Sequence, residues 1–179
     1  MEPRPKRPGR KDYLNQFKMD DTGQYAYRGT FMAYAAGGES WKKELLFIWL
    51  CCVIPLILLA VMGFLPQSGL DGNLIVLLPY GLSLIALFAL IWKVCRLTYG
   101  GQKIRKYVYD STVKTLPGYA AAVMILAAFA LVGGIITQIL GTFHGTVLSA
   151  VLLFAGEVCA GLGGFFVQKI IRGMDWKET

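Results

Sequence analysis

The sequence predicts an all-α integral membrane protein, a bundle of four transmembrane helices arranged as two helical hairpins. Of its 179 residues, 55% are hydrophobic and 16% are charged, whereas an ordinary soluble domain has about 25% charged residues. The apolar residues fall in four long runs, and the lysines and arginines fall in the segments before, between and after them. Together these observations indicate that lipid is the solvent of the central part of the chain.

The chain begins with a polar segment, residues 1–44. Residues 1–11 are basic and rich in proline, and they have too little apolar surface to bury, so they are predicted to be disordered. Residues 25–31 alternate in part between aromatic and small or polar side chains, and residues 20–23 offer a turn ahead of them. This pattern predicts a short β-hairpin packed on the membrane surface or on the cytoplasmic loop, because an isolated two-stranded hairpin is marginally stable in water.

The four apolar runs predict a transmembrane domain over residues 45–168. Each run is long enough to cross about 30 Å of hydrocarbon as a helix, and a helix satisfies its own backbone groups there. The connectors after the first and third runs are short, so the first and second helices form one antiparallel hairpin and the third and fourth form another. The predicted spans are residues 45–64, 74–92, 119–140 and 146–167.

The basic residues predict the orientation of the bundle. Nine of the 18 lysines and arginines precede the first span, six lie in the loop at residues 93–118, and three lie in the tail at residues 169–179. The positive-inside rule therefore predicts a multi-pass protein of the cell membrane with both termini in the cytoplasm and its basic segments near anionic headgroups. Within the loop, residues 102–116 carry a weak helical stripe that predicts a surface helix ending before Pro117. No nucleic-acid partner is expected, because these charges form no recognised binding module.

Glu157 is the only formally charged residue within the four predicted spans. It lies near the bilayer midplane, where an ionised carboxylate facing lipid costs at least about 2.5 kcal/mol. We therefore expect Glu157 to face the bundle, protonated or hydrogen-bonded, with Ser83 near the same depth and Tyr80 a turn nearer the outside. Two interpretations stay open: a structural hydrogen bond between helices, or the proton or cation site of a small transporter.

Small residues in the third and fourth spans predict close helix packing. Gly156, Ala160 and Gly164 follow a small-xxx-small spacing in the fourth span, and Gly133 and Gly134 offer the same feature in the third. Such residues let helix backbones approach each other, either within one bundle or between copies of the chain. A homo-oligomer or a complex with another membrane protein is therefore one expectation.

Pro55 and Pro79 interrupt the first and second spans. Each proline removes one helical hydrogen bond and invites a kink. Broken helices occur at transporter binding sites, but membrane helices also tolerate proline for structural reasons, and the structural kink is the favoured interpretation.

No sequence motif specifies a chemical reaction. The single histidine and the four cysteines lack the spacing of a metal site, and no Walker A, Rossmann or nucleophile-elbow pattern occurs, so no catalytic residue, metal or cofactor is expected. The first functional hypothesis is a non-enzymatic accessory, assembly or immunity-type protein that binds a partner through its helices and its cytoplasmic face. The alternative is a small proton- or cation-linked transporter or channel organised around Glu157.

Overall fold

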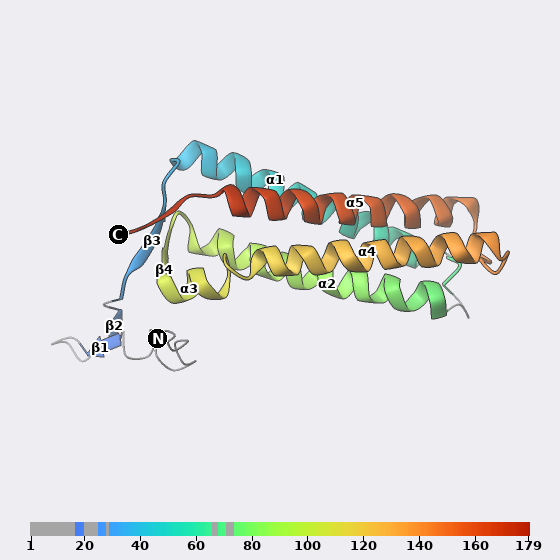
Figure 1. Cartoon of the computed structure of the whole chain (residues 1–179), viewed down its shortest axis with the longest axis horizontal. Coiled ribbons are helices and arrows are strands. Elements are labelled where there is room, and N and C mark those ends of the chain that lie inside the picture. The colour runs from blue at the N-terminus through green and yellow to red at the C-terminus, as the bar shows by residue number, and fades with distance from the viewer. Residues whose placement is uncertain (1–16, 20–24, 28, 66–67, 71–73) are drawn as a thin grey trace, which may run out of the picture.

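Four long helices form a bundle with a small β-sheet at one end, as the computed structural model shows (Figure 1). Two predictions, the disordered segment at residues 1–11 and the turn at residues 20–23, lie outside the residues that the structure describes. The described residues are 17–19, 25–27, 29–65, 68–70 and 74–179.

Each of the four long helices has 24 to 27 residues. At about 1.5 Å per residue they are about 36–40 Å long, and all four are apolar enough to cross a membrane. The prediction of four helices that are long and apolar enough to span a membrane is therefore confirmed. The helices are α1 (Gly38–Phe64), α2 (Leu74–Gly100), α4 (Leu116–Ile139) and α5 (Val147–Gly173).

The helices extend past the predicted spans at the end that carries the sheet. α1 begins at Gly38 rather than at residue 45, α2 ends at Gly100 rather than at residue 92, and α5 ends at Gly173 rather than at residue 167. Hydropathy marks the hydrocarbon layer, but backbone hydrogen bonding continues through polar residues until a helix stop occurs. For α2 that stop is Gly101, whose left-handed φ of 69° is the conformation that ends many helices.

α5 is the helix that holds the bundle together. It packs along its length against both α1 and α4, and α4 in turn packs against α2. The contact between α1 and α2 is the smallest of the four, although these helices are consecutive in the chain. All neighbouring helices are antiparallel (Figure 1). The predicted pairing of the third and fourth helices is extensive, whereas the first hairpin is joined to the rest mainly through α5 and α4.

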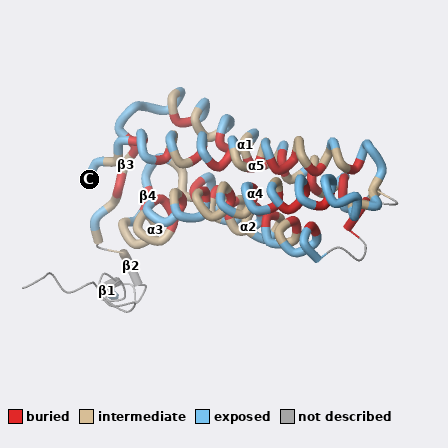
Figure 2. The backbone as a smooth tube through the Cα atoms, turned by 45° about the vertical axis from the view of Figure 1, so that its right-hand side comes forward, coloured by how far each residue is buried: buried red, intermediate tan, exposed pale blue. Residues whose placement is uncertain are grey.

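The inward faces of the helices are buried and the outward faces are apolar but exposed (Figure 2). Leu59, Leu87 and Leu153 are almost fully buried between helices, while Phe129 and Leu162 leave more than half of their surface exposed. An outer surface of this kind is stable only in an apolar solvent, so it faces the lipid.

A three-stranded antiparallel sheet joins parts of the chain that are far apart in sequence. The central strand β3 (Phe31–Tyr34) pairs with β4 (Lys103–Arg105) on one side and with β5 (Trp176–Glu178) on the other. The sheet therefore links the N-terminal segment, the loop between α2 and α4, and the C-terminal tail. We call the end of the bundle that carries it the sheet end.

The loop does not contain the surface helix expected at residues 102–116. That segment instead forms β4, the six-residue helix α3 (Lys106–Ser111) and the start of α4. Pro117 lies in the first turn of α4, where its missing N–H has no helical partner to lose. Further upstream, β1 (Phe17–Met19) pairs antiparallel with β2 (Tyr25–Tyr27).

An aromatic cluster attaches the sheet to the helices. Trp176 of β5 contacts Trp41 of α1, Tyr34 of β3 and Tyr109 of α3, with ring centroids 5.6 to 5.9 Å apart. Tyr34 and Trp41 are buried, and burial raises the pKa of the Tyr34 phenol above its ordinary value. The side chains therefore form a continuous apolar layer that fixes the position of the sheet on the bundle.

Candidate functional site

The predicted polar residues come together near the middle of the bundle. Glu157 on α5 and Ser83 on α2 are both fully buried, and Tyr80 on α2 is 6% exposed. Ser83 and Tyr80 are the side chains of α2 that interact electrostatically with the Glu157 carboxyl. The structure thus places all three predicted site residues in one region, although α2 and α5 lie diagonally across the bundle.

The Glu157 carboxyl has no hydrogen bond of normal geometry. Neither of its oxygens, nor the Ser83 hydroxyl that faces it, has a partner among the described residues. Burying an ionised carboxylate without a partner is costly, so this position requires a proton or a bound cation. Both interpretations of Glu157 remain open, because Ser83, the side chain that interacts with the carboxyl, can serve as a structural partner or as part of an ion site.

Tyr80 makes its hydrogen bond to another helix rather than to Glu157. Its hydroxyl donates to the backbone carbonyl of Leu59 in α1 at 2.9 Å. The hydroxyl fits there because Gly63 has no side chain: a β-carbon on Gly63 would lie 2.3 Å from the Tyr80 oxygen. This bond fastens α1 to α2 where their packing is otherwise sparse.

Pro55 leaves a carbonyl without its helical partner, and α5 covers that carbonyl. Since proline has no N–H, the oxygen of Cys51 loses its usual hydrogen bond from residue 55. The Cys51 oxygen lies against Gly163 of α5, only 2.4 Å from where a β-carbon of residue 163 would be. The glycine therefore lets α5 approach and shield a polar group that lipid could not satisfy.

The same arrangement occurs at Pro79. This proline deprives the carbonyl of Ile75 of its partner, and the Ile75 oxygen lies 2.8 Å from the β-carbon position of Gly133 in α4. Glycine Cα–H groups in such close contacts are weak hydrogen-bond donors. Both prolines thus lie inside continuous helices, with the freed carbonyls directed at glycines of neighbouring helices.

The other predicted packing residues also lie between helices of this chain. Gly156 contacts the Leu59 side chain of α1. A β-carbon on Gly164 would lie 2.8 Å from the carbonyl oxygen of Ala120 in α4. Ala160, between them on the same face of α5, is fully buried. The small-residue face of α5 is therefore occupied within one bundle.

Gly134 contributes a contact between the last two helices. Its β-carbon position lies 3.2 Å from the Phe154 ring of α5. α4 therefore approaches α2 at Gly133 and α5 at Gly134.

The outer surface of the sheet end is basic and aromatic. Lys103 lies over the Phe31 ring at 5.2 Å, and Arg105 lies over the Tyr27 ring at 5.3 Å. Lys177 is exposed on the neighbouring strand β5. We call these three cations, with the two rings beneath them, the sheet face.

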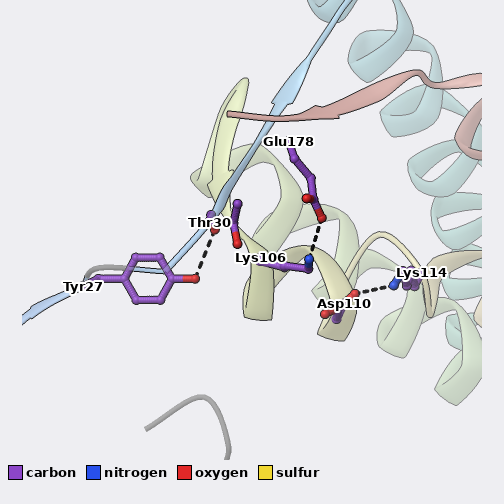
Figure 3. A network of polar contacts seen from close by, with 6 residues as sticks. All are labelled: Tyr27, Thr30, Lys106, Asp110, Lys114 and Glu178. Atoms are coloured by element: carbon purple, nitrogen blue, oxygen red, sulfur yellow. Dashed lines mark hydrogen bonds and ion pairs between the residues drawn. The ribbon is translucent and has the colours of Figure 1, made fainter. Parts of the chain in front are cut away.

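Two ion pairs border the sheet face (Figure 3). Lys106 contacts Glu178 of β5 at 2.5 Å, and Lys114 contacts Asp110 one turn away at 2.6 Å. The carboxylates of Glu178 and Asp110 are therefore paired with lysines that do not belong to the sheet face.

No protein-family model, no curated protein and no solved structure matches the chain. The class of the protein follows from its own architecture: it is a multi-pass helical membrane protein built on a four-helix bundle.

Sequence reasoning missed two features of the site. Its small-residue spacing did not include Gly163, although a proline inside a lipid-facing helix signals a carbonyl that some neighbour must cover. It also did not predict the aromatic cluster, in which Trp41 and Trp176 contact each other.

Replacing Gly163 with alanine is expected to destabilise the bundle, because the new β-carbon would overlap the Cys51 carbonyl. Overpacking of this kind costs about 1–3 kcal/mol, so the purified variant should melt at a lower temperature in detergent. Gly161→Ala is the matched control, since its β-carbon would have no neighbour closer than 3.9 Å. Equal melting temperatures for the two variants would contradict the proposed role of Gly163.

Proposed function

We propose that the chain is a multi-pass protein of the cell membrane with both termini in the cytoplasm. The charge distribution supports this orientation: the cations lie at the sheet end, whereas the connectors at the opposite end, residues 65–73 and 141–145, contain no lysine or arginine. Basic loops next to membrane helices stay in the cytoplasm.

We propose that the protein is an accessory, assembly or immunity-type interaction protein rather than an enzyme. It binds its partner in the membrane through the sheet end. The observation that carries the proposal is that three distant chain segments form one sheet with a buried aromatic core. A surface fixed in this way binds with little loss of conformational entropy. Two of the sheet-face cations, Lys103 and Arg105, lie over aromatic rings, and this arrangement suits an acidic surface of a membrane-protein partner.

A second candidate function is a proton- or cation-linked transport step at Glu157. It is favoured by the buried carboxyl that lacks a hydrogen-bond partner among the described residues. Tyr80, Thr137 and Ser149 are buried between Glu157 and the opposite end of the bundle. Toward the sheet end, the buried residues of α2 and α5 are apolar in composition. The buried polar side chains are therefore on one side of Glu157, and the other side is a hydrophobic barrier of the kind that seals an ion site.

The orientation is tested by introducing one cysteine at a time and labelling intact cells with a membrane-impermeant thiol reagent. We expect His144→Cys, at the opposite end, to be labelled, and Lys177→Cys, in β5, to be labelled only after the cells are lysed. The wild-type chain is the blank, because its four cysteines lie within the long helices. Labelling of Lys177→Cys in intact cells would contradict the orientation.

The interaction function is tested by purification in mild detergent. We expect the wild-type chain to retain one membrane protein in fixed stoichiometry, and the triple variant Lys103→Gln, Arg105→Gln, Lys177→Gln to retain about tenfold less. That estimate takes about 0.5 kcal/mol for each exposed charge. Lys114→Gln is the control, because Lys114 is already paired with Asp110. Capture that is unchanged in the triple variant would exclude the sheet face as the binding surface.

The transport function is tested in liposomes that carry an ion gradient and a pH-sensitive dye. If Glu157 carries the ion, the wild-type chain should dissipate the gradient, and Glu157→Gln should abolish the flux while keeping its melting temperature. Glu39→Gln, which removes an exposed acid from the first turn of α1, should leave the flux unchanged. The absence of flux in the wild-type chain would exclude this candidate.

A further inference from the structure

A groove of about 310 Å³ runs along the outer surface of the bundle between α1 and α5. It lies beside the contact between Pro55 and Gly163, where the lack of a side chain on residue 163 leaves room between the two helices. Its walls are apolar side chains that are partly exposed. They are Phe47, Leu50, Ile54, Cys159, Leu162 and Phe166.

An aromatic pair lines the groove on its sheet-end side. The rings of Phe47 and Phe166 meet edge to face with centroids 5.8 Å apart. Because Phe47 and Phe166 face the lipid, this pair lies within the hydrocarbon layer.

Two lysines stand just beyond the aromatic pair. Lys43 is one helical turn from Phe47 on α1, and Lys169 is one turn from Phe166 on α5, so both continue the stripes that wall the groove. Arg172 follows on α5 and lines an adjoining hollow with Lys169. Lys43, Lys169 and Arg172 are exposed, and none of the three forms an ion pair with a described residue.

We propose that this groove is a binding site for one anionic phospholipid. One acyl chain lies in the apolar groove, and the phosphate lies between Lys43 and Lys169, about 4.5 to 6 Å beyond the aromatic pair by helical rise. The lysines without ion pairs lie at the level of the headgroups and match the anionic phosphate. The apolar groove lies at the depth of the acyl chains and matches their hydrocarbon.

A second copy of the chain is the competing occupant. In a two-fold dimer the same surface patch of each copy would meet its counterpart. Lys43 and Lys169 of one copy would then approach those of the other, and the like charges would repel at the headgroup level. The charge distribution therefore favours a lipid over a second copy.

The site is tested by native mass spectrometry of the full chain, purified in detergent and titrated with phosphatidylglycerol or with phosphatidylcholine of identical acyl chains. We expect one phosphatidylglycerol molecule to bind with higher affinity than phosphatidylcholine. Lys43→Gln with Lys169→Gln should weaken phosphatidylglycerol binding about twenty-five-fold, at about fivefold for each lysine. Phosphatidylcholine carries its phosphate next to a choline cation, so its binding should weaken less, and the preference for phosphatidylglycerol should be lost.

Two further variants complete the experiment. Lys42→Gln with Lys114→Gln removes the same charge away from the groove and should keep the preference for phosphatidylglycerol. Cys159→Phe fills the groove and should weaken the binding of both lipids. Equal affinity for the two lipids, or an unchanged preference in the Lys43 and Lys169 variant, would overturn the proposal, as would a lipid-free dimer.

This site does not depend on the partner bound by the sheet end. The Lys43 and Lys169 variant keeps Lys103, Arg105 and Lys177, so it should still capture the partner. The two proposals can therefore fail separately.

Discussion

Lipid cannot donate a hydrogen bond, and the packing of this bundle depends on that constraint. Pro55 and Pro79 each leave one backbone carbonyl without its helical partner, and a carbonyl exposed to hydrocarbon is unfavourable. The structure covers the oxygens of Cys51 and Ile75 with the backbones of α5 and α4, which is possible only because residues 163 and 133 are glycines. Each proline is therefore matched to a glycine on a neighbouring helix, and these two contacts set how closely the helices approach.

The position of α5 follows from these close contacts and gives Glu157 its surroundings. Since small residues on one helix meet both α1 and α4, α5 is held on two sides and its carboxyl points into the centre of the bundle. α2 reaches that centre from across the bundle and is fastened to α1 by the Tyr80 hydroxyl. A shift of α2 relative to α5 would change the distance between Ser83 and Glu157. The hydrogen bonding of the carboxyl therefore depends on how α2 is held, and its contact with α1 is the smallest in the bundle.

The sheet end has a different origin of stability. There the chain leaves the hydrocarbon, and three strands that are too short to be stable alone are joined by pairing and by the aromatic rings around Trp176. As a result, β3, β4 and β5 are held together against the helix ends. This rigidity supports the proposed docking role of the sheet face, while the groove between α1 and α5 adds a separate contact with lipid.

The sequence by itself determined the fold class, the four helices and the inward direction of Glu157, because lipid acts on every residue of a run and leaves a strong compositional signal. It did not determine where the helices end, since hydropathy responds to hydrocarbon and not to helix stops such as Gly101. The sheet was missed because each of its strands has only three or four residues and pairs with a distant segment. Likewise, only the tertiary structure decided that Gly163 faces Cys51 and that Tyr80 bonds to Leu59, because such contacts depend on which helices are neighbours.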